Sequence, residues 1–174
     1  MKSRAMVLGH PIHPMLITFP VGLFVTGVLF ELIGLIGGDR LWVQIALYMV
    51  AAGIIGGLLA AVAGFIDYLA IPAGTRAKSV ATMHGAGNFI RVALFAIAWL
   101  LWFQTPRDIG VIPAILTFIG VCIIGVTGWL GGELVDRLGV GVDPGANLNS
   151  PNSLSGLPAD ADLRGQERRT RHSA

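Results

Sequence analysis

The chain has 174 residues, of which 54% are hydrophobic and 13% are charged, and its mean hydropathy is +0.73. Soluble domains contain about 45–50% apolar and about 25% charged residues, so this composition excludes an ordinary soluble protein and indicates one embedded in a membrane. The formal net charge of +2 fits anionic lipid as a neighbour, and no arginine or stacked-aromatic pattern typical of nucleic-acid binding is present. The single cysteine, Cys122, excludes an internal disulfide.

Four apolar stretches are each long enough to cross the hydrocarbon core of a bilayer, which needs about 20 residues. Short polar turns separate them, so consecutive stretches run in opposite directions. The sequence therefore predicts one all-α integral membrane domain over residues 1–142, with four transmembrane helices in an antiparallel bundle. The predicted spans are residues 15–37, 41–67, 80–105 and 109–133. Trp99 and Trp102, near the end of the third span, are expected to form part of an aromatic belt at the membrane interface.

Residues 143–174 differ sharply in composition, being rich in Asp, Pro, Asn, Ser and Gly with few large apolar residues. Such a segment cannot bury enough surface to offset the entropy of ordering it, so we predict a largely disordered tail. The tail ends in four arginines, which could attract lipid headgroups or simply form a solvated terminus: Arg164, Arg168, Arg169 and Arg171.

Basic residues outside the spans are distributed unequally between the two ends of the predicted bundle. Five lie at the end that carries both termini, even without the tail, namely Lys2, Arg4, Arg76, Lys78 and Arg137. Only Arg40 and Arg107 lie at the other end. Because basic loops stay on the cytoplasmic side, this asymmetry predicts that both termini are cytoplasmic.

The stretch Gly9-His10-Pro11-Ile12-His13-Pro14 places two imidazoles directly before the first span. A proline in the first turn of a helix costs no hydrogen bond, because its missing N–H would be unpaired there anyway. We therefore expect Pro14 to open the first helix and His13 to lie at its cap, with His10 just outside.

Polar residues from all four predicted helices reach the same membrane depth. At about 1.5 Å per residue, His13, Asp67 and His84 all lie near the cytoplasmic interface, and Glu133 joins them from the fourth span. Asn88 and Arg91 continue the face of His84 by one and two further turns.

Two intramembrane charges need a separate explanation. An unpaired arginine at the depth of Arg91 costs at least about 2.5 kcal/mol, so we expect Arg91 to reach Asp67, Glu133 or a bound anion. Glu31 lies toward the opposite side of the bundle, where it could pair with a turn residue or line a separate polar pocket.

Two cofactors fit the first of these clusters. Imidazoles and carboxylates suit a transition metal, for which the candidate ligands are His10, His13, Asp67, His84 and Glu133. Alternatively, His13 and His84 could be the axial ligands of a b-type haem, with Asn88 and Arg91 completing the cofactor-binding set. Both hypotheses make the protein a haem- or metal-binding membrane redox component.

Two other classes of function stay open. The polar groups could merely satisfy one another at helix ends of a structural or interaction protein without a cofactor. They could also form a proton path through Asp67, His84 and Glu133 in a proton-coupled transporter of small solutes. No Gly-x-Ser-x-Gly elbow and no phosphate-binding glycine loop is present, so the sequence leaves any enzyme activity undecided.

Small residues recur at four-residue spacing, which lets membrane helices pack closely. The pairs are Gly34 and Gly38, Gly53 and Gly57, Ala60 and Gly64, and Gly128 and Gly132. We expect these pairs to face neighbouring helices and to allow backbone-to-backbone contact.

Four motifs give the chain a family resemblance: GHPIHPMLITFPVGL at the start, GFIDYLAIPAG at the end of the second span, His84-x-x-x-Asn88, and the closing GGELVDRLGVGV. The chain resembles the bacterial membrane proteins of domain-of-unknown-function family 2231 (DUF2231) over residues 7–145. The family closes with GG-x-LVY-x-HG-x-GV, so Asp136 and Leu138 here replace a tyrosine and a histidine. The resemblance implies a multi-pass protein of the bacterial cytoplasmic (inner) membrane. It further implies an iron–sulfur protein as a redox partner, since some relatives occur with Rieske-type domains, and homo-oligomers are a further possibility.

Overall fold

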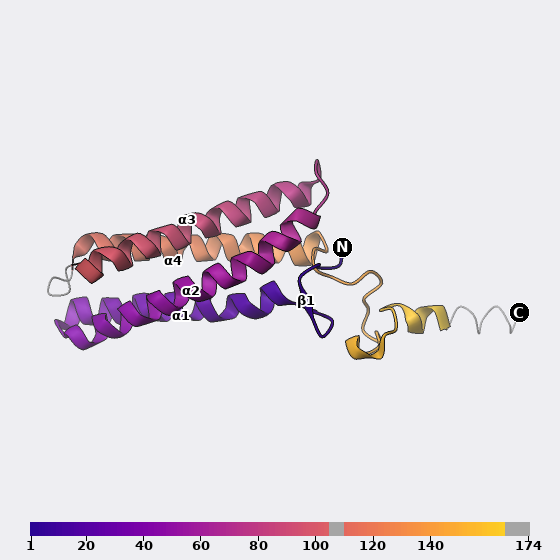
Figure 1. Cartoon of the computed structure of the whole chain (residues 1–174), viewed down its shortest axis with the longest axis horizontal. Coiled ribbons are helices and arrows are strands. Elements are labelled where there is room, and N and C mark those ends of the chain that lie inside the picture. Colours follow the sequence, from indigo (N-terminus) through magenta and orange to yellow (C-terminus); the bar gives the residue numbers. More distant parts are fainter. Residues whose placement is uncertain (105–109, 166–174) are drawn as a thin grey trace, which may run out of the picture.

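The computed structural model describes residues 1–104 and 110–165, and four long helices dominate it. These helices are α1 (Ile12–Gly37), α2 (Arg40–Ala70), α3 (Arg76–Gln104) and α4 (Val111–Gly132). All four are long and apolar enough to cross a membrane, and consecutive helices run antiparallel (Figure 1). The predicted four-helix membrane bundle is thus confirmed. The predicted ends of two spans, at residues 105 and 109, lie outside the described residues, and the cytoplasmic position of the termini stays a prediction.

The bundle consists of two helical hairpins. α1 packs mainly along α2 and α3 mainly along α4, with smaller contacts between α2 and α3 and between α1 and α4 (Figure 1). We call α1–α2 the first hairpin and α3–α4 the second hairpin. The terminal end of the bundle is where α1 begins and α4 ends, and the distal end is the opposite one. Helices α1 and α3 lie diagonally across the bundle.

The centre of the bundle is a stacked pair of aromatic rings that joins the two hairpins. Phe24 and Phe95 are fully buried, and their ring centroids lie 4.0 Å apart. Glycines make room for these rings, because a Cβ at Gly53 would lie 2.8 Å from the Phe24 ring and one at Gly120 would lie 2.7 Å from the Phe95 ring. Of the pairs predicted from the four-residue spacing, Gly53 thus accommodates a side chain. Gly34 does meet backbone, since a Cβ there would lie 3.0 Å from Val43 N, whereas Gly128 has no atom within 4 Å of such a Cβ.

The segment before α1 forms a small β-hairpin. Strands β1 (Met6–Val7) and β2 (His10–Pro11) pair antiparallel around Leu8 and Gly9, which both have positive φ. Helix α1 then begins at Ile12, with Pro11 at the N-cap position. His13 thus lies in the first turn of α1 and not at its cap as predicted, because Pro11 already supplies the extended residue from which the helix starts.

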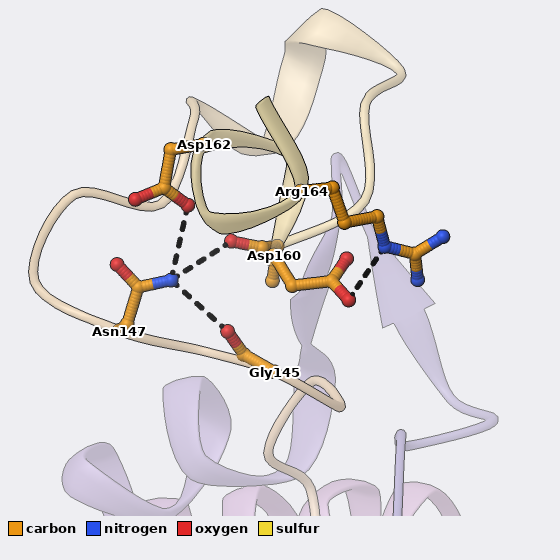
Figure 2. A network of polar contacts seen from close by, with 6 residues as sticks. Gly145, Asn147, Asp160, Asp162 and Arg164 are labelled. Carbon is orange, nitrogen blue, oxygen red and sulfur yellow. Dashed lines mark hydrogen bonds and ion pairs between the residues drawn. The ribbon is translucent and has the colours of Figure 1, made fainter. Parts of the chain in front are cut away.

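The chain after α4 contains short local elements, and the disorder of residues 143–174 stays a prediction. A π-helical turn, η1 (Glu133–Arg137), ends the fourth span, and a short 3₁₀ turn, η2 (Ser153–Ser155), follows. The Asn147 amide donates to Gly145 O, Ala159 O and Asp162 Oδ1 at 3.1–3.2 Å, while Arg164 Nε pairs with Asp160 Oδ2 at 2.7 Å (Figure 2). Such bonds between side chains and nearby backbone order a segment without an apolar core. The predicted disorder of residues 166–174 lies outside the described residues.

Candidate functional site

His13 is fixed against the second helix of its own hairpin. Its Nδ1–H donates to the carbonyl oxygen of Ala60 on α2 at 2.8 Å. The ring lies so close to α2 that a Cβ at Gly64 would be 2.8 Å from Nδ1. Since a carbonyl can only accept, this contact places the proton on Nδ1, and Nε2 has no partner among the described residues.

His84 is held in the same way within the second hairpin. Its Nδ1–H donates to the carbonyl oxygen of Thr127 on α4 at 2.9 Å. The Asn88 amide, one turn along α3, donates to His84 Nε2 at 3.0 Å and to the His84 carbonyl at 2.9 Å. A Cβ at Gly131 would lie 3.3 Å from the ring, so a small residue again makes room for the imidazole. His84 is therefore the neutral tautomer with its proton on Nδ1.

The two imidazoles meet between the hairpins at the terminal end. Their ring centroids are 6.1 Å apart and their planes are inclined by 79°. They come from the diagonal helices α1 and α3, so this contact crosses the bundle axis. Each ring is oriented by a carbonyl of its own hairpin, and the pair has no direct hydrogen bond.

Asp67 reaches the terminal end but binds the N-terminal segment. Its carboxylate accepts hydrogen bonds from Ser3 Oγ at 2.7 and 2.8 Å, from the Arg4 N–H at 2.7 Å and from the Ala5 N–H at 3.1 Å. These donors occupy both carboxylate oxygens. Asp67 thus anchors the segment that precedes α1.

The other two predicted metal ligands lie apart from the histidine pair. Glu133 forms an ion pair with Arg76, which joins the end of α4 to the start of α3. His10 lies exposed on the β-hairpin, with Nε2 3.4 Å from Ser153 Oγ in the segment after α4. Over residues 1–104 and 110–165, no group of three or more His, Cys, Asp or Glu side chains is arranged to hold a metal. A metal site here would therefore rest on two protein ligands.

Arg91 lies in the middle of the bundle, one turn beyond Asn88. It is only 3% exposed, its guanidinium carbon lies 5.5 Å from the centroid of the Phe24 ring, and its Nε is buried without a hydrogen-bond partner. The ring face offsets part of the cost of burying this cation. The carboxylates of Asp67 and Glu133, which we expected it to reach, are engaged by other donors.

Glu31 is the one buried carboxyl of the described chain, at 1% exposure, and it lies in the distal half. Its Oε2 is 2.6 Å from Thr117 Oγ1 on α4, and its Oε1 is buried without a partner. The sequence marks Glu31 as the charge within the first span but gives no sign of Thr117, because a threonine inside an apolar run usually bonds back to its own helix.

The sequence did not reveal the groups that orient the histidines. Ala60 and Thr127 act through backbone carbonyls, which leave no trace in residue type. Ser3 was also missed as a partner of Asp67. The only available signal was glycine at positions 64 and 131, where a larger residue would collide with an imidazole.

Comparison with known proteins identifies the family. A family model described as a predicted membrane protein, DUF2231, matches residues 9–144. No curated protein and no solved structure gives a significant match. Because the family match spans all four helices, including both residues of the histidine pair, the chain belongs to the DUF2231 family of predicted membrane proteins.

Proposed function

We propose that this multi-pass membrane protein binds a transition metal between His13 and His84 and works as a membrane redox component. The observation that carries the proposal is the orientation of the two rings. Each donates Nδ1–H to a backbone carbonyl, at 2.8 Å for His13 and 2.9 Å for His84. Metal-binding histidines characteristically hold their other ring N–H in this way, since it fixes the tautomer and presents a basic Nε2.

The two rings are close enough for both to hold one ion. Metal–imidazole bonds are about 2.0–2.1 Å long. The ring centroids of His13 and His84 lie 6.1 Å apart, so a single ion between them could be held by both side chains.

A single ion fits the described structure better than a haem does. A haem needs a hollow several side chains wide beside its axial ligands. Two hollows of the described structure are an apolar groove between α1 and α2 and one beside Lys2 and Asp160. Neither is lined by His13 or His84, and we therefore favour a single ion.

Asn88 controls access to one of the two ligands. Its amide donates to His84 Nε2 in the described state, so this amide must turn away before Nε2 can bind a metal. Imidazole ligands suit copper, iron, nickel and zinc, and a metal with two accessible oxidation states would supply one-electron chemistry. The protein holds this ion at the membrane surface, where an iron–sulfur partner could exchange electrons with it. We place this activity in the bacterial cytoplasmic membrane.

The test is metal analysis of protein purified in mild detergent from cells supplied with copper, iron and zinc. We expect about one metal ion per chain in the wild type and its loss in His13→Asn and in His84→Asn. Asparagine keeps an N–H donor near the position of Nδ1 but has no counterpart of Nε2, so these variants should fold. An optical spectrum of the same samples reports a haem if the hairpins open enough to bind one.

Two matched controls distinguish this site from the wider cluster. His10→Asn and Asp67→Asn should retain the metal, because those side chains contact Ser153 and the N-terminal segment. A wild-type protein without metal or haem would leave a structural role for the histidines. Metal that persists in both His13→Asn and His84→Asn would place the site elsewhere.

A further inference from the structure

Glu31 lies within the membrane-spanning part of the bundle. It is six residues before the end of α1, about 9 Å along the helix axis, and its side chain is 1% exposed. It faces Thr117 on α4, which is fully buried, so the pair lies between the two hairpins. Val28, one turn before Glu31, packs in the same apolar cluster as Trp102 of α3.

The charged and titratable groups around Glu31 leave it without a cation partner among the described residues. On the first hairpin, Asp39 caps α2 and Arg40 begins it, and both side chains are exposed. On the second hairpin, Arg91 lies over the Phe24 ring and Cys122 is exposed. Arg107 and Asp108 lie outside the described residues. Burying an ionised carboxylate without a charged partner is very costly, whereas a protonated carboxyl is tolerated.

Counting the hydrogens available around Thr117 also indicates that Glu31 is protonated. Its Oγ1 lies 2.6 Å from Glu31 Oε2 and 3.0 Å from the carbonyl oxygen of Ala114. A hydroxyl has one hydrogen, and a carbonyl can only accept. If Thr117 donates to Ala114, as threonines in helices commonly do, the short contact with Glu31 needs a proton on the carboxyl. A protonated Glu31 satisfies both contacts, while an ionised one leaves Ala114 and Oε2 competing for a single hydrogen.

We infer that Glu31 is a proton-binding site in the distal half of the membrane, and that its proton joins the first hairpin to the second through Thr117. Loss of the proton weakens the contact between α1 and α4 at this level. This site is independent of the histidine pair, which lies at the other end of the bundle.

Infrared spectroscopy of the purified full chain tests this inference. At about pH 7, where a free glutamate is ionised, the wild type should show the carbonyl stretch of a protonated carboxyl. This band should disappear in Glu31→Gln, which has nearly the same shape and should fold normally. Transfer to D2O should shift the band, because an exchanging proton is replaced by deuterium.

Two controls refine the assignment. Thr117→Val should move the band to the frequency of a carboxyl without a hydrogen bond, and Glu133→Gln should leave the band unchanged because Glu133 is paired with Arg76. An apolar carbodiimide should modify Glu31 in the wild type, with modification falling as the pH rises. A wild-type spectrum without the band, or a band that persists in Glu31→Gln, would overturn the inference.

Discussion

The two ends of the bundle hold their buried polar groups in opposite ways. At the terminal end, His13 and His84 each bond to a carbonyl within their own hairpin, and the two rings meet without a direct bond. In the distal half, Glu31 bonds straight across to Thr117 of the other hairpin. The hairpins therefore meet without a direct hydrogen bond between the two rings at one end and through a hydrogen bond at the other. In our proposals a metal bridges one end and a proton the other.

The largest expected effect is a difference in labelling between the two ends of the bundle. Our comparison requires the terminal end and the distal end to face opposite sides of the membrane. In a Cys122→Ser background, an impermeant thiol reagent added to intact cells should label Asp39→Cys in the distal turn. It should not label Ala73→Cys in the exposed turn between α2 and α3, because the basic residues at that end predict a cytoplasmic position.

Permeabilised cells provide the control, in which both variants should be labelled. Labelling of Ala73→Cys in intact cells would show that the protein has the opposite orientation in the membrane. It would also place the histidine pair on the outer side.

The next largest effect is expected at the terminal end, where Gly64→Leu should dislodge the His13 ring. An added Cβ would lie 2.8 Å from Nδ1, so the ring must leave Ala60. Overpacking of this kind typically costs about 1–3 kcal/mol. Unfolding in detergent should show the loss, and the metal content should fall with it.

Gly128→Leu is the matched control on α4. Nothing lies within 4 Å of a Cβ at that position, and the glycine is exposed, so stability should stay the same or rise slightly with helix propensity. Equal losses in both variants would mean that Gly64 does not accommodate the ring.

The smallest expected effect is a gain in metal affinity in Asn88→Ala. This change removes the amide that occupies His84 Nε2. The change also removes the bond from this amide to the His84 carbonyl, so the bundle should lose some stability as well. Because one hydrogen bond contributes about 1 kcal/mol net, metal binding should become about fivefold tighter by titration.

Thr82→Ala is the control on the same helix, since Thr82 contacts Tyr68 and neither histidine. Its affinity should match the wild type. Weaker binding in Asn88→Ala would show instead that the amide orients His84 for the metal.

The depth of each polar residue along its helix could be predicted from the sequence, but the direction in which its side chain points around the helix could not. Counting residues along apolar spans places His13, Asp67 and His84 at one level, and the structure does bring the two rings within 6.1 Å. Asp67 lies at that level but points to Ser3, and Glu133 pairs with Arg76. The helices are apolar on nearly all sides, so no polar face indicates which way a side chain points.

Trp102 illustrates the same limit in the distal half. Its position near the end of a span predicted a place in an aromatic belt, yet it is 2% exposed and packs with Phe24 and Phe95 in the core. A tryptophan near a helix end can face either lipid or neighbouring helices. Only the packing of the second hairpin against the first decides between them.

The division into two hairpins also bears on how the protein is made. During synthesis the first hairpin enters the membrane before the second, and α1 and α2 are joined by a very short turn. His13 therefore acquires its carbonyl partner as soon as the first hairpin closes, and His84 does so when the second one closes. Each half of the histidine pair is ordered within its own hairpin, so the metal site that we propose would be completed only when the two halves dock.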